Sequence, residues 1–236
     1  MSMNFVHATD ILHWKSPWHR FFYISTSVSF VVFTICLIVI GNVWDNPVLG
    51  EDGILENLSA LIYFVAFAVA LYVAFKPRKN RTRIMNMLVL CAGFLGFMDE
   101  LSFGERMFDL EMPVIREVKI DGVHDFVHLA YLILEDRLPG KVLSMLVVVA
   151  GVVVCSVLWY LRSDILQKYP EHEDKSLFLW ACGMVVMATV IDLDFLDNMF
   201  FFLLEELFEL AGGLALATAA FFQLDEVRKT AKEKFE

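Results

Sequence analysis

Three glutamates lie inside a long apolar run, where carboxylates are unfavourable. The run FFFLLEELFELAGGLALATAAFF covers residues 200–222 and carries Glu205, Glu206 and Glu209 in its first half. An ionised carboxylate near the centre of a bilayer costs about 2.5–3.5 kcal/mol on insertion scales. Helical residues three or four apart share a face, so Glu209 lies beside both other glutamates. Protons, basic partners or a bound cation must therefore compensate them.

Other candidate ligands are expected at the same depth of the membrane. Glu56 lies at the start of a second apolar run, Asp99 and Glu100 end a third, and His124 follows in a polar segment. Carboxylate oxygens suit Mg, Ca or Mn, whereas carboxylates mixed with imidazole suit Zn, Mn or Fe. The pattern predicts a divalent-cation site and does not distinguish between these metals.

The predicted site draws its residues from four separate segments. The expected metal ligands are Glu56, Glu100, His124, Glu206 and Glu209. Supporting or alternate ligands are expected among Asp99, Ser102, Arg106, Glu205 and His128. Arg106 is the expected internal counter-ion, because this side of the membrane has few basic residues. Asp192, Asp194 and Asp197 are expected as turn and cap residues. No catalytic residue is assigned.

The segments that position these residues are six apolar runs. Of the 236 residues, 58% are hydrophobic and 22 are Phe, and a helix needs about 20 residues to cross the hydrocarbon core. The runs cover residues 21–43, 57–75, 84–99, 142–161, 176–191 and 199–222. The sequence therefore predicts an all-α polytopic membrane protein with six transmembrane helices.

The distribution of charge predicts the orientation. The connection KPRKNRTR, residues 76–83, is strongly basic and is expected inside the cell. Alternation then places both termini inside, with residues 1–20 and 223–236 as cytoplasmic segments around a membrane domain of 21–222. No cleavable signal peptide is evident in residues 1–20. The formal net charge of −10 is then concentrated on the outer side. The expected location is a prokaryotic inner membrane.

The outer segment, residues 101–141, is too polar to span the membrane but contains one helical pattern. Asp121, His124, Asp125 and His128 recur at helical spacing on one polar stripe. This pattern predicts a short interfacial or re-entrant helix. In the last run, Gly212-Gly213 is expected to let another helix approach closely.

Four motifs resemble one family. They are GEDGILE at residues 50–56, DELSFGERMF at 99–108, VHD at 123–125 and EELFEL at 205–210. Their order is similar to that in a family of uncharacterised prokaryotic multi-span membrane proteins. Phe103, Glu105 and Asp125 depart from that family's Trp, Gln and Asn. The resemblance implies a common site and no particular reaction. It singles out Glu51, Asp52, Glu56, Glu100, Ser102, Gly104, Arg106, His124, Glu205, Glu206 and Glu209.

These observations favour one function and leave two others open. The leading hypothesis is an integral membrane protein that binds divalent cations in an acidic and histidine-containing cavity in the outer half of the bilayer. As an enzyme it would act on a lipid-linked or small ionic substrate, with a metal-activated water. The alternatives are a proton- or cation-coupled transporter or channel, and a sensor or assembly subunit with a structural acidic clamp. Nucleic-acid binding is not expected, and the oligomeric state stays open.

Overall fold

The computed structural model describes residues 53–76, 80–168, 173–192 and 199–232. The predicted first span, 21–43, lies outside the described residues. So do Glu51, Asp52, Asp194 and Asp197, as does the side chain of Arg106.

Long helices account for most of the described chain. They are α2 (Ile54–Ala74), α3 (Asn80–Glu100), α6 (Gly140–Lys168), α7 (Glu173–Asp192) and α8 (Met199–Lys232). Of these, α2, α6, α7 and α8 are long and apolar enough to cross a membrane by length and composition. Helix α3 has 21 residues but carries Arg83 near one end and Asp99 and Glu100 at the other. The prediction of a largely helical chain with helices able to span a membrane is confirmed for these four helices, whereas the predicted number of six spans stays a prediction. Helix α8 continues as far as Lys232, so the segment predicted as a separate tail from residue 223 is largely helical.

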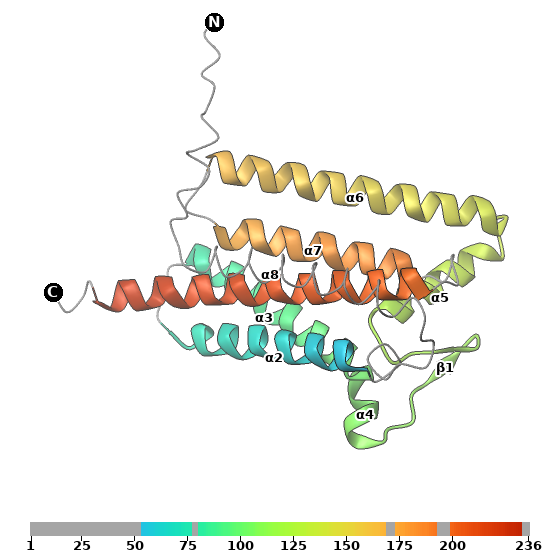
Figure 1. Cartoon of the computed structure of the whole chain (residues 1–236), viewed down its shortest axis with the longest axis horizontal. Coiled ribbons are helices and arrows are strands. Elements are labelled where there is room, and N and C mark those ends of the chain that lie inside the picture. Colours follow the sequence, from blue (N-terminus) through green and yellow to red (C-terminus); the bar gives the residue numbers. More distant parts are fainter. Residues whose placement is uncertain (1–52, 77–79, 169–172, 193–198, 233–236) are drawn as a thin grey trace, which may run out of the picture.

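The long helices form a bundle with α8 at its centre (Figure 1). Helix α8 packs against α2 and α7, α3 packs mainly against α2, and α6 packs against α7. Successive long helices run in opposite directions (Figure 1). Therefore α2, α6 and α8 begin at the same end at which α3 and α7 finish; we call this the acidic end.

Small side chains allow the central helices to approach closely. Ala66 and Ala70 of α2 and Ala215 and Ala219 of α8 are fully buried in the core. A methyl group added at Gly93 of α3 would lie 2.9 Å from the backbone nitrogen of a residue of α2. Small residues at such interfaces allow the backbones of the two helices to come into direct contact.

The glycine pair of α8 has the role that the sequence predicts. A methyl group at Gly212 would lie 3.1 Å from the Tyr63 hydroxyl of α2 and 3.5 Å from the backbone oxygen of Ala181 of α7. At Gly213 it would lie 3.2 Å from Ile62 of α2. Close approach of helices at Gly212-Gly213 is therefore confirmed.

Shorter elements connect α3 to α6 at the acidic end. They are a 3-10 turn η2 (Ser102–Gly104), helix α4 (Glu105–Phe108), an antiparallel hairpin of β1 (Val114–Ile115) and β2 (Val118–Lys119), and helix α5 (His124–Glu135). Helix α5 confirms the short helix predicted in residues 101–141. The hairpin was not predicted, because its turn uses Arg116 and Glu117 at φ of 53° and 69° instead of the Asn-Gly or Asp-Gly signal of such turns.

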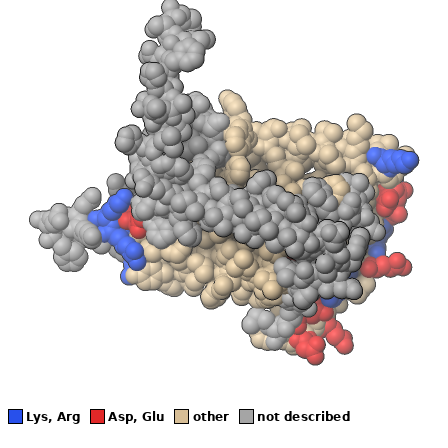
Figure 2. All heavy atoms as spheres, in the orientation of Figure 1, with Lys and Arg blue, Asp and Glu red and all other residues tan. Residues whose placement is uncertain are grey.

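Charged side chains gather at the two ends of the bundle (Figure 2). On the visible face, the end at which α8 finishes is mainly basic, the acidic end carries most of the Asp and Glu, and uncharged side chains fill the band between. Along the long helices, exposed apolar side chains include Leu61, Phe64, Leu88, Val153 and Tyr160, each at least 40% exposed. Such a band is expected of a surface that faces lipid.

Candidate functional site

A small polar cavity lies at the acidic end of the bundle. Its volume is about 130 Å³, and we call it the acidic cavity. Its walls are formed by Glu56, Asp99, Glu100, His124, Phe202, Glu205, Glu206 and Glu209. The structure therefore brings the five predicted ligands to one cavity, together with two of the predicted supporting residues, Asp99 and Glu205.

The directions of the helices explain this convergence. Glu56 lies in the first turn of α2, and Glu100 is the last residue of the antiparallel neighbour α3. His124 begins α5, which follows the loop after α3. Glu206 and Glu209 lie two to three turns into α8 and share a face. Residues from four segments thus meet because these segments begin or end at the same depth.

Glu206 is the most informative side chain of the acidic cavity. It is only 9% exposed, and its Oε2 atom has no hydrogen-bond partner. A buried carboxylate oxygen without a partner is strongly unfavourable, because it has lost its hydrogen bonds to water and has formed none within the protein. Glu100 is similarly buried, at 7%. The cavity is therefore one in which a cation or bound protons would lower the free energy of the folded protein.

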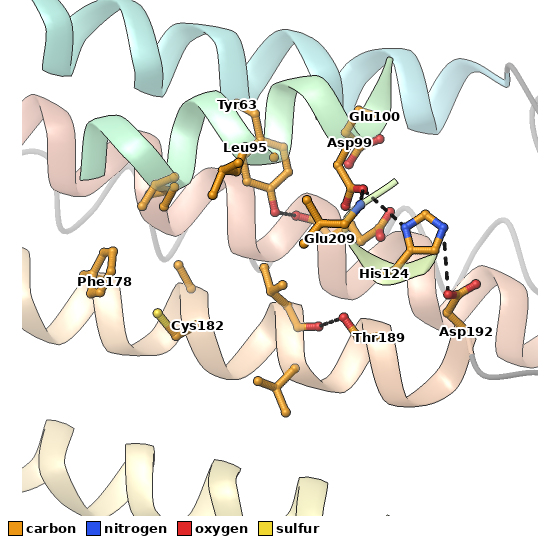
Figure 3. A pocket seen from close by; sticks show the side chains of 17 residues that line it. Tyr63, Leu95, Asp99, Glu100, His124, Phe178, Cys182, Thr189, Asp192 and Glu209 are labelled. Carbon is orange, nitrogen blue, oxygen red and sulfur yellow. Dashed lines mark hydrogen bonds and ion pairs between the residues drawn. The ribbon is translucent and has the colours of Figure 1, made fainter. Parts of the chain in front are cut away.

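His124 lies between carboxylates from three elements, and Figure 3 shows two of them, Asp99 and Asp192. Its Nδ1 is 3.3 Å from Oδ1 of Asp99, and its Nε2 is 3.6 Å from Oδ1 of Asp125 and 4.0 Å from Oδ2 of Asp192. Burial by itself lowers the pKa of His124, but the hydrogen bond to Asp99 and the surrounding negative charges raise this pKa to about 10. The imidazolium form is thus an internal counter-ion of the acidic end.

One group of three donor atoms lies close enough to share an ion among the described residues. The donor atoms of Asp121, His124 and Asp125 are within 4.8 Å of one another. Local hydrogen bonds account for this group. Asp125 accepts the backbone N–H groups of Asp121 at 2.9 Å and Gly122 at 2.6 Å, and Lys119 lies 2.8 Å from Asp121. These contacts already hold both carboxylates in place without an ion, so the group is better explained as a structural turn.

Two of the remaining predicted site residues, Ser102 and His128, are not brought to the acidic cavity. Ser102 lies in the 3-10 turn at φ 49°, and His128 lies one turn beyond His124 on α5. Neither lines the acidic cavity. The expected counter-ion role of Arg106 falls outside the described side chains. Lys119 has such a role instead, since its Nζ contacts both Glu105 and Asp121.

A larger and mostly apolar cavity adjoins the acidic cavity, and Figure 3 shows its lining. Its volume is about 350 Å³, and we call it the apolar cavity. Asp99, Glu100, His124 and Glu209 line both cavities. The rest of its lining comes from Tyr63, Ala92, Leu95, Gly96, Val123, Phe178, Ala181, Cys182, Val185, Val186, Thr189, Asp192 and Leu216.

Tyr63 and Asp192 are lining residues that the sequence analysis did not assign to a site. The Tyr63 hydroxyl donates a hydrogen bond of 3.1 Å to the backbone oxygen of Glu209, which ties α2 to the glutamate turn of α8. Asp192, expected as a turn or cap residue, is helical at the end of α7, and residues 193–198 after it lie outside the described residues. The sequence could have pointed to Asp192, because it continues the helical spacing of the residues of α7 that face the cavity. No sequence signal separates Tyr63 from an ordinary core aromatic residue.

Comparisons of the chain with protein-family models, with curated proteins and with solved structures found no match. The resemblance carried by the four motifs therefore stays a prediction.

Proposed function

We propose that this protein is an integral membrane protein of a prokaryotic inner membrane that binds a divalent cation in the acidic cavity. In this proposal six helices span the bilayer, both termini are cytoplasmic, and the acidic end lies in the outer half. The observation that carries the proposal is the convergence of Glu56, Glu100, Glu206 and Glu209 on one cavity. The unpartnered Oε2 of Glu206 adds a reason for a positive ion to bind there.

The donor set limits the chemistry of the proposed ion. Carboxylate oxygens dominate the lining, which favours Mg²⁺, Ca²⁺ or Mn²⁺. His124 would have to lose its proton to act as a ligand, and it would then extend the choice to Zn²⁺ or Fe²⁺. The glutamates surround about 130 Å³, so binding would draw their carboxylates inward. Ionised carboxylates repel one another, and a bound cation would offset this repulsion.

An enzymatic role follows if the ion keeps an open coordination position. It would activate a water molecule, and a second carboxylate of the cavity would accept the proton. Hydrolysis or transfer on a lipid-linked substrate fits a site at the end of membrane-embedded helices. The alternative function is that of a transporter or channel, in which the same carboxylates would carry protons or cations.

A structural clamp is the second candidate, and a specific observation favours it. His124 is surrounded by Asp99, Asp125 and Asp192 and can offset part of the negative charge without a metal. One histidine does not balance the eight carboxylates of the acidic end that contact it or line the acidic cavity with it. For this reason we favour the cation.

Metal analysis of the purified protein tests the proposal. We expect wild-type protein to retain close to one Mn²⁺ or Zn²⁺ per chain after dialysis, and Glu206→Gln and Glu209→Gln to lose it. Glu226→Gln is the matched control, because Glu226 lies on the same helix, is exposed, and is far from the cavity in sequence. Wild-type protein without bound metal, together with glutamine variants of higher thermal stability, would favour the clamp and reject the cation site.

A further inference from the structure

The apolar cavity has the shape of a site for one lipid chain. Two helices present regular faces to it: Ala92, Leu95 and Gly96 of α3, and Phe178, Cys182 and Val185 of α7. These residues follow the spacing of three and four that places side chains on one helical face. At about 350 Å³, the cavity is at the lower end of the volumes of ligand pockets, roughly 300–1,000 Å³. One chain therefore fits this volume better than two.

The length and direction of the cavity match one leaflet of a bilayer. Its wall on α7 extends from Phe178 to Asp192 at the acidic end, about 21 Å at a rise of 1.5 Å per residue. The part from Phe178 to Thr189, before the acidic end, is about 16 Å long. One leaflet of hydrocarbon is roughly 15 Å deep, half of the usual 30 Å. The carboxylates lie at one end of the cavity and Phe178 lies at the other (Figure 3). A lipid with its head group at the acidic end would thus lie parallel to its neighbours in the leaflet.

The side of the apolar cavity provides an entrance from the membrane. Leu95 of α3 is 47% exposed and Val185 of α7 is 43% exposed, although both line the cavity. Helices α3 and α7 each pack mainly on other helices and contact one another only slightly. A chain can therefore enter between these two helices without leaving an apolar environment.

The shared wall of the two cavities sets the chemistry of the head group. Asp99, Glu100 and Glu209 line both cavities, so a head group at the end of the apolar cavity would touch an ion in the acidic cavity. Cations of the Mg²⁺ type are commonly held by one or two carboxylates together with the phosphate of a substrate. An anionic phosphate would complete the coordination that the glutamates begin.

We propose that the apolar cavity binds the hydrocarbon chain of a single-chain lipid phosphate, whose phosphate group coordinates the cation held by Glu206 and Glu209. This inference rests on the proposed cation site and names the substrate class for it. It stands on the junction of the two cavities, the unpartnered carboxylate oxygen of Glu206 and the half-exposed side chains at the entrance.

The test uses purified full-length protein in a neutral detergent, with Mn²⁺ or EDTA. The probes are radiolabelled dodecyl phosphate, inorganic phosphate and dodecylamine, and retention on the immobilised protein is measured. We expect dodecyl phosphate to be retained with Mn²⁺ and released by EDTA. Inorganic phosphate should bind much more weakly, because it has no chain to occupy the apolar cavity.

Two tryptophan variants on one helix locate the chain. Leu95→Trp fills the entrance and should weaken dodecyl phosphate binding by about tenfold or more, as expected of an overfilled apolar pocket, while Mn²⁺ retention is unchanged. Leu88→Trp is the matched control: Leu88 is 45% exposed, lies two turns away on the same helix and does not line the apolar cavity. This control should bind dodecyl phosphate like wild-type protein.

The outcomes separate this inference from the proposed function. Retention of Mn²⁺ without retention of dodecyl phosphate would overturn the lipid inference and leave the cation site standing, as would equal binding by the two tryptophan variants. Absence of Mn²⁺ binding would overturn both. Stronger retention of dodecylamine in EDTA than of dodecyl phosphate in Mn²⁺ would overturn the assignment of the head group in favour of a cationic amphiphile.

Discussion

Gly96 controls how closely α3 approaches the tyrosine that ties α2 to α8. A methyl group at this position would lie 2.6, 2.7 and 2.9 Å from Cδ1, Cε1 and Cγ of Tyr63, well inside the usual carbon–carbon contact of about 3.5–4.0 Å. Tyr63 is 4% exposed, and its hydroxyl is bonded to the backbone oxygen of Glu209. The ring cannot move aside without losing this hydrogen bond. Gly96→Ala should therefore destabilise the protein.

The expected change in the free energy of unfolding combines two costs and one gain. Overpacking costs about 1–3 kcal/mol, and a buried hydroxyl left without its acceptor costs about 1–3 kcal/mol. The higher helix propensity of alanine returns up to about 1 kcal/mol. A net loss near 3 kcal/mol would lower the midpoint of thermal unfolding by about 6–12 °C for a chain of this size.

Thermal unfolding in detergent measures this loss, and two further variants test its cause. Gly183→Ala is the matched control, because its new methyl group would be 4.0 Å from the nearest side-chain atom, Cδ1 of Leu158; we expect it to be neutral or slightly stabilising. Tyr63→Leu removes the ring, so Gly96→Ala should cost much less in that background. An equal cost of Gly96→Ala with and without the Tyr63 ring, or no cost at all, would refute the packing argument.

Two other predictions concern the turn formed by Asp121, His124 and Asp125. Because the pKa of His124 is raised to about 10 from 6.5, its contribution to stability is fully present below about pH 6.5 and is lost as pH rises through 10; in EDTA the midpoint of thermal unfolding should fall over this range, and His124→Gln should remove that part of the fall. An unchanged profile in the variant would contradict the ion-pair role. Asp125→Ala should cost about 2–3 kcal/mol, because the carboxylate accepts two backbone N–H groups, whereas Asp125→Asn keeps one acceptor and should cost less. Equal midpoints for the two variants would show that these hydrogen bonds contribute little.

The helical elements could be predicted from the sequence because hydrocarbon offers no hydrogen-bond partners to a backbone. A run such as 57–75 has no other way to satisfy its backbone polar groups in hydrocarbon, and α2 is helical from Ile54 to Ala74. The hairpin of β1 and β2 could not be predicted, since Arg116 and Glu117 hold positive φ without glycine. Arg116 pairs with Asp136 at 2.7 Å, a contact across 20 residues that the local sequence pattern does not encode.

The residues of the acidic cavity could be predicted for a different reason. Glu56, Glu206 and Glu209 interrupt apolar helices, and such acids rarely face lipid. Because α2 and α8 both begin at the acidic end (Figure 1), acids near the start of each helix meet at a similar depth. The partners of His124 were harder to predict, because they depend on how the loop after α3 turns back. The pairing with Asp99 and Asp192 reflects that turn and has no counterpart in sequence spacing.

The position of the cation is the central claim, and anomalous diffraction from crystals of the Mn²⁺-loaded protein tests it most directly. We predict one strong peak inside the acidic cavity, within coordination distance of Glu206 and Glu209, and no such peak in crystals of Glu206→Gln. A peak at the Asp121, His124 and Asp125 turn, or no peak anywhere near these glutamates, would contradict the account.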